Sequence, residues 1–127
     1  MKLAHFNADA APQPAGGYTQ VTSVSNATRL VFVSGQIPQN EKGEVPRTFH
    51  EQARQVWRNL IAQLSAADMT IADLVKLTTF LSSRDYAIAN REIRQEFLGS
   101  HKCAVTVVVA GIFDEGWLLE IEAIAAQ

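Results

Sequence analysis

The residues best suited to chemistry stand on the last predicted strand, which runs from Leu118 to Ala125. Side chains alternate along a strand, so one face carries Leu119, Ile121, Ala123 and Ala125, and the other carries Leu118, Glu120, Glu122 and Ile124. Two carboxylates therefore share a face with two aliphatic side chains. We predict that at least one of them borders a half-buried site, where a carboxylate can direct a water molecule. The alternative is that both are solvated residues on a free sheet face.

Two other short segments could contribute to such a site. Tyr18 follows a pair of glycines at the end of a Pro/Gly-rich loop, residues 8–17, and its hydroxyl could project into a cleft. The apolar run 30–33 leads directly into Ser34-Gly35-Gln36, where the glycine can bring backbone close to a ligand or form a bulge. Together with Glu120, these groups could bind a small polar molecule.

Other kinds of site lack support in the sequence. The three histidines, His5, His50 and His101, are far apart, so no metal site is predicted. Cys103 is the only cysteine, which excludes an internal disulfide, and we interpret it as a small structural apolar residue. There is no G-x-S-x-G elbow, P-loop or G-x-G-x-x-G motif, and no cofactor is expected.

Composition indicates an ordinary globular chain. Its 127 residues are enough for one domain, residues 1–127, and it is 47% hydrophobic and 19% charged. A net charge of -2 with scattered Lys and Arg disfavours nucleic-acid binding. The absence of a long apolar stretch disfavours membrane insertion, so we expect a cytoplasmic protein.

The remaining patterns predict an α+β protein with a mixed sheet. Strands are expected at 18–23, 30–33, 75–81, 105–110 and 118–125, and helices at about 49–67 and from Tyr86 to Gly99. The first helix should begin at a Thr48-x-x-Glu51 capping box and bury Trp57 in the core. The apolar stripe of the second is predicted to consist of Tyr86, Ala89, Ile93 and Phe97.

Two helices can cover only one face of a sheet of this size. Strands 30–33 and 105–110, however, are apolar on both faces, as is typical of buried strands. The second face therefore needs a cover, and a partner subunit is the simplest one. We accordingly predict a homo-oligomer.

Three segments carry a family resemblance: Tyr18-Thr19-Gln20, Leu30 to Pro38, and Glu120 to Ala125. They resemble the RidA/YjgF family, also labelled endoribonuclease L-PSP, and the similarity spans nearly the whole chain. The resemblance implies a chorismate-mutase-like fold with two helices on one face of the sheet. It also implies a homotrimer with a central β-barrel and small-molecule clefts between subunits.

The resemblance further implies an activity. Enzymes of this family hydrolyse 2-imino acids, or their enamine tautomers, to 2-oxo acids and ammonia without a cofactor. It assigns the water-directing role to Glu120, while Tyr18 and Ser34 line the cleft and the Gly35 backbone holds the ligand. The other ligand-binding positions that it implies are Asn90, Val105 and Val107.

The sequence departs from the family at one important position. Val105 stands where the family has an arginine that binds the substrate carboxylate. Losing such a pair costs about 2 to 5 kcal/mol by analogy with buried charge pairs. Lys102, Arg47, Arg91 or Arg94 could reach the cleft instead, although each is otherwise expected to be a solvated surface charge.

Two functions remain open on this evidence. The first is a cofactor-free imine or enamine deaminase, acting on a compound like 2-iminobutanoate or 2-iminopropanoate or on a less acidic analogue. The second is a binding or regulatory trimer that has lost deaminase activity because of Val105. Endoribonuclease activity is disfavoured by the acidic charge balance.

Overall fold

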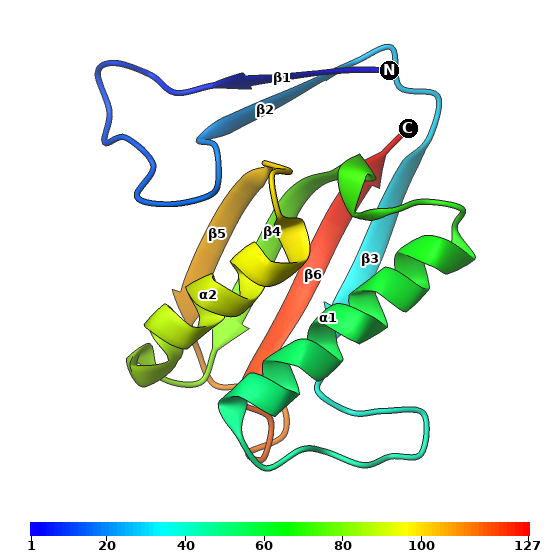
Figure 1. Cartoon of the computed structure of the whole chain (residues 1–127), viewed down its shortest axis with the longest axis vertical. Helices are drawn as coiled ribbons and strands as arrows, with labels where there is room; N and C mark the ends of the chain where they lie inside the picture. Colours follow the sequence, from blue (N-terminus) through cyan, green and yellow to red (C-terminus); the bar gives the residue numbers. More distant parts are fainter.

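A four-stranded mixed sheet with both helices on one face forms the body of the protein (Figure 1). The computed structural model describes all residues, 1–127. Across the sheet the strands are β3 (Leu30–Gln36), β6 (Leu119–Ala126), β4 (Leu74–Leu81) and β5 (Ala104–Val109). β4 and β5 are parallel, and the other two pairs are antiparallel. The predicted α+β class and mixed sheet are confirmed.

The first helix, α1 (Phe49–Ala66), closely matches its prediction. The hydroxyl of Thr48 accepts a hydrogen bond from the backbone N–H of Glu51 at 3.3 Å, which is one half of the predicted capping box. The complete box lies elsewhere, at Thr70 and Asp73, where it begins the short 3-10 helix η1 (Ile71–Asp73). No helix in the structure combines the length and the hydropathy that crossing a bilayer requires.

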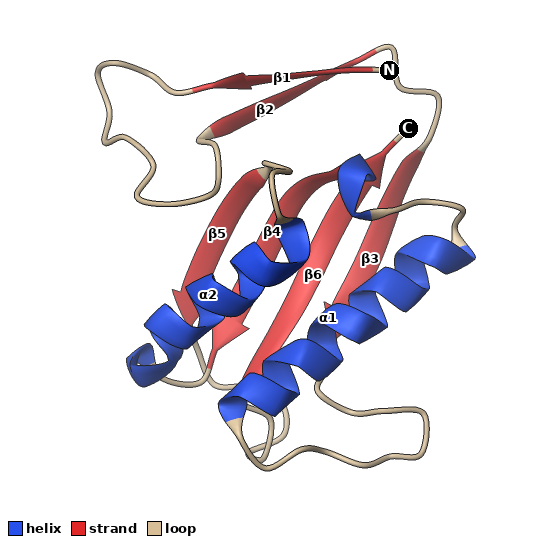
Figure 2. Ribbon diagram, viewed as in Figure 1, coloured by secondary structure: helices blue, strands red, loops and turns tan.

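The second helix, α2 (Ala87–Leu98), ends at Gly99 as predicted. This glycine has a φ of 58°, a left-handed conformation that residues with a Cβ adopt at a cost. Before α2, the chain makes a second 3-10 turn, η2 (Arg84–Tyr86), whose first turn is capped by the hydroxyl of Ser83. The helices stand out in blue in Figure 2, one beside the other over the sheet.

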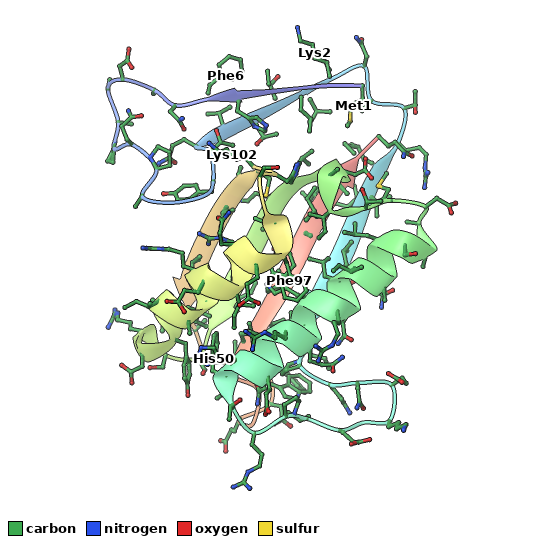
Figure 3. All side chains as sticks on the ribbon, in the orientation of Figure 1. Met1, Lys2, Phe6, His50, Phe97 and Lys102 are labelled. Atoms are coloured by element: carbon green, nitrogen blue, oxygen red, sulfur yellow. The ribbon has the colours of Figure 1, made fainter.

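The core lies between the helices and the sheet. Trp57 is only 1% exposed, as predicted, and its ring stacks on Phe97 of α2 with the centroids 5.4 Å apart. Phe97 lies on the side of α2 that faces α1 (Figure 3). From the last strand, the side chains that enter this core are Leu119, Ile121, Ala123 and Ala125. The predicted alternation of β6 is therefore confirmed.

The opposite face of the sheet is open within one chain. Phe32 of β3 is 72% exposed, and Leu30 is also exposed. Val108 of β5, which alternates with Val107 and Val109 on the helical face, is exposed on this face as well. Strands that looked buried on both faces are thus covered on one, because both helices pack on the same side (Figure 1). This is the uncovered apolar face that the strand pattern required.

A separate two-stranded hairpin lies at the N-terminus. It consists of β1 (Lys2–Phe6) and β2 (Val21–Ser25) and stands apart from the main sheet (Figure 1). β1 was not predicted, and β2 begins at Val21, later than the strand predicted to begin at Tyr18. Neither strand contains a fully buried residue, so the hairpin has no clear apolar face that a periodicity could reveal.

Candidate functional site

The predicted site residues fall into two groups on opposite faces of the sheet. The first group lines a cavity of about 230 Å³ between α2, β5 and the Pro/Gly-rich loop. The residues around it are Ala15, Tyr18, Ala87, Asn90, Arg91, Arg94, Val105 and Val107. The second group, Ser34, Gly35 and Glu120, lies on β3 and β6.

The valines enter the first cavity because of the register of β5. Val105 pairs with Leu77 of the parallel neighbour β4, and Leu77 belongs to the buried core under the helices. Val105 and Val107 are two residues apart and so point to the same, helical face. β5 is the edge strand of the sheet, so no further strand borders the cavity on the side away from β4. The loop that leads to Tyr18 borders it there.

A close approach between loop and helix places Tyr18. A Cβ added at Gly17 would collide with the side-chain amide of Gln95 on α2, so the loop lies close against this side of the helix. The backbone N–H of Tyr18 donates to the carbonyl of Gly16 at 2.6 Å. Next to it, Thr19 bridges to Ala104 and joins the loop to β5.

Arg94 is the one of the four basic candidates that is buried at this cavity. Two alternatives were open for it, and because it is only 5% exposed, the solvated surface charge is the wrong one. Its guanidinium carbon lies 5.9 Å from the centroid of the Tyr18 ring. The signal available in the sequence was its spacing, because Arg94 lies one helical turn after Asn90 and shares its face.

None of the other basic candidates is buried at the cavity. Lys102 is exposed and lies just before β5 (Figure 3). It is not among the residues that line the cavity. Arg47 is exposed and is also absent from the lining. Arg91 does line the cavity but is exposed to solvent.

The second group is organised by a bulge in β3. Val33 pairs with Ala123 and Gln36 with Ile121, so three steps along β3 match two along β6. The extra residue falls at Ser34-Gly35, as the glycine suggested. A Cβ added at Gly35 would overlap a carboxylate oxygen of Glu120 and lie 2.7 Å from its Cδ. The bulge thus brings bare backbone against the Glu120 carboxylate.

The Glu120 carboxylate has no partner within the chain. It is half-buried, and the only ion pair in the structure joins Arg54 and Glu96. In the sheet Glu120 is opposite Phe80 of β4, on the face away from the helices. A free carboxylate in this setting can accept a proton or a hydrogen bond from a bound water. Ser34 opens onto a separate hollow of about 320 Å³ on the same face, with Thr78 and Glu122.

The two groups cannot meet around one ligand within a single chain. Val105 and Val107 face the helices, whereas Glu120 faces away from them. β4 also stands between β5 and β6 in the sheet. No group of three or more His, Cys, Asp or Glu side chains gathers anywhere in the structure. The features available for chemistry are therefore a cavity with a buried guanidinium and, across the sheet, an unpaired carboxylate beside a glycine.

This architecture and this pair of half-sites define a class of small α+β proteins that comparisons with known proteins identify. The endoribonuclease L-PSP family model matches residues 8–127. A RutC family protein of Pyrococcus horikoshii is 37% identical over 118 residues, covering 91% of this chain and 90% of that protein. TdcF of Escherichia coli, by name a candidate reactive intermediate deaminase, is 33% identical over 122 residues and covers 92% of each. The chain belongs to this family, the RidA/YjgF family.

Solved structures agree with this assignment. The Rid family protein YyfB from Yersinia pestis superimposes with a TM-score of 0.85 at 26% identity, covering 100% of both chains. RidA from an Antarctic Psychrobacter gives a TM-score of 0.74 at 29% identity, over 98% of this chain and 99% of that one. The fold implied by the family resemblance is confirmed.

Proposed function

We propose that this protein is a cofactor-free hydrolytic deaminase for a small imine or enamine. The observation that carries the proposal is the unpaired, half-buried carboxylate of Glu120 against the Gly35 backbone. Burying a carboxylate without a partner lowers stability, so its position is better explained by chemistry than by folding. Membership in a family that includes TdcF, by name a candidate deaminase, supports the same conclusion.

The proposed site lies between subunits of a homotrimer. Tyr18, Asn90, Val105 and Val107 would come from one chain, and Ser34, Gly35 and Glu120 from the next. Two observations support this arrangement: the half-sites face away from each other within one chain, and the sheet face that carries Glu120 leaves Phe32 bare. Closing three such sheets into a barrel would cover that face.

The reaction needs only water and a positioned base. Glu120 accepts a proton from a water molecule as the water oxygen bonds to the imine carbon, which gives a carbinolamine. The imine enters protonated at nitrogen, so this carbinolamine is neutral. The Glu120 carboxyl then returns the proton to the nitrogen, and the C–N bond breaks as the carbinolamine hydroxyl gives its proton to the Glu120 carboxylate, which leaves ammonia and a 2-oxo compound. An enamine must first take a proton at carbon to become the imine. The backbone of Gly35 helps to hold the ligand beside the carboxylate.

A non-catalytic trimer that binds a metabolite is the second candidate. One observation favours it, namely Val105 at the position of the family's carboxylate-binding arginine. In this case ligands would bind saturably and leave unchanged. The two candidates differ in product formation, which makes them separable by one assay.

The test is hydrolysis of 2-iminobutanoate, generated in place by an amino-acid oxidase. The wild type should release 2-oxobutanoate faster than the uncatalysed reaction, and Glu120→Gln should lose this acceleration by about 10²- to 10⁴-fold. Glu115→Gln is the matched control, since Glu115 is exposed in the preceding loop and borders no cavity. An unchanged rate of hydrolysis in Glu120→Gln would contradict the proposal. Saturable ligand binding without turnover in the wild type would favour the second candidate.

A further inference from the structure

Arg94 is a buried cation without a counterion. Its side chain is 5% exposed, and it forms neither an ion pair nor a hydrogen bond within the chain. No polar side-chain atom is both fully buried and unpartnered, so the guanidinium nitrogens must be reachable, and the accessible space beside them is the cavity. A guanidinium excluded from bulk water and open to a cavity is arranged to meet a ligand.

The surroundings of Arg94 contain no negative charge. The cavity lining includes no Asp or Glu, and a second cation, Arg91, borders the same space. Burial, and secondarily the charge of Arg91, lowers the pKa of Arg94 from its ordinary value, although an arginine stays protonated at neutral pH. An uncompensated charge in this position destabilises the folded chain unless an anion enters the cavity.

From these contacts we propose that Arg94 binds the carboxylate of the ligand, taking from helix α2 the role that Val105 cannot fill on β5. The inference rests on the proposed function only for the identity of the rest of the ligand. The negative charge of the ligand is inferred independently of that function. The guanidinium is a planar fork that pairs with both oxygens of a carboxylate. The Tyr18 ring lies within cation–π range of it, with the guanidinium carbon 5.9 Å from the ring centroid.

The rest of the cavity limits the size and type of the anion. Within one chain this half of the site has a volume of about 230 Å³, which suits the carboxylate and a short chain of a small ligand. Val105 and Val107 offer methyl groups to a short aliphatic chain, and Asn90 offers an amide. These features fit a short 2-oxo or 2-imino monocarboxylate. The ligand of this protein is therefore a carboxylate anion, although Val105 replaces the arginine of the family.

The test measures ligand binding and not turnover. The probes are 2-oxobutanoate and its uncharged analogue 2-oxobutanamide, with dissociation constants measured by calorimetry or NMR titration on the intact oligomer. We expect the wild type to prefer the acid, and Arg94→Gln to weaken acid binding by about 30-fold or more while leaving amide binding within a few-fold. Arg94→Lys keeps the charge but not the planar fork, so its affinity for the acid should lie between those of the wild type and Arg94→Gln. Arg58→Gln, an exposed arginine of α1 away from the cavity, is the matched control.

A stability measurement separates ligand binding from a structural role. If Arg94 binds the ligand carboxylate, Arg94→Met should raise the melting temperature of the ligand-free protein, because the substitution removes an unpaired buried charge. A lower melting temperature, or a change in oligomeric state, would mean that Arg94 pairs with another subunit and would overturn the inference. Four binding results would also overturn the inference. Two concern the wild type with the acid, namely no binding of the acid or equal affinity for acid and amide. The others are tighter binding of inorganic phosphate than of the acid, and unchanged acid binding in Arg94→Gln. Acid binding through Arg94 without hydrolysis of 2-iminobutanoate would uphold the inference and reject the deaminase.

Discussion

The carboxylate of Glu120 rests against the backbone of Gly35, so closely that a Cβ on Gly35 would overlap it. The two residues meet because the bulge in β3 interrupts its pairing with β6 at this point. Glycine is needed at this position because a side chain would overlap Glu120. The backbone conformation does not require glycine, since the φ of Gly35 is not in the left-handed region.

Gly35→Ala should therefore displace the Glu120 carboxylate and reduce the proposed deaminase turnover by on the order of 10²-fold, the size of effect that a small misplacement of a reacting group produces. The rate is measured with 2-iminobutanoate as above. Gly111→Ala is the matched control, because a Cβ at Gly111 would meet no atom within 4 Å. Full activity in Gly35→Ala would show that the position of Glu120 is not critical.

The open sheet face offers a test of the oligomer. Phe32→Asp places a charge on the face that we propose to be covered by other subunits, where an unpaired carboxylate is costly. We expect the proposed trimer to dissociate, as measured by sedimentation velocity. Phe113→Asp is the control, since Phe113 is 94% exposed in the loop before β6 and should leave assembly unchanged. A Phe32→Asp protein that remains trimeric would place the interface elsewhere.

Cys103 gives a prediction for the pH dependence of stability. Burial raises the pKa of its thiol to about 11 from an ordinary value of 9.0. Between these pH values the folded chain keeps a proton that the unfolded chain has lost, so stability falls as the pH rises. The expected loss is about 2 to 3 kcal/mol, at 1.36 kcal/mol for each unit.

Denaturant unfolding of the wild type and of Cys103→Ala at pH 8 and pH 11 isolates this effect. Other groups also titrate in that range, so the informative quantity is the difference between the two proteins. The wild type should lose more stability than Cys103→Ala between the two pH values. Equal losses would mean that the thiol is not protected from ionisation in the native state.

The stacked pair Trp57 and Phe97 should be central to stability. Trp57→Ala leaves a large cavity between α1 and α2, so we expect the free energy of unfolding to fall by about 3 to 5 kcal/mol. Ile61→Ala on the exposed side of the same helix should cost no more than about 1 kcal/mol. Comparable losses in the two variants, measured by urea unfolding, would contradict the assignment of the core.

Local patterns determined most of the secondary structure. The alternation along β6, the apolar spacing of α1 and the glycine that ends α2 each depend on residues close together in the chain, and all three are confirmed. β1 was missed because a short strand without a buried face has no periodic signal. The helix cap at Thr48 was half right, since the hydroxyl bond forms and the return bond from Glu51 does not.

The sequence by itself determined the family, the sheet with its helices on one side, and the candidate residues of the site. Only the tertiary structure decided how those residues are grouped, because their faces depend on strand order and on pairing register, which join distant parts of the chain. Arg94 shows the difference most clearly. Its helical spacing is visible in the sequence, but its burial depends on the loop and on β5 closing over α2, and no local pattern records those contacts.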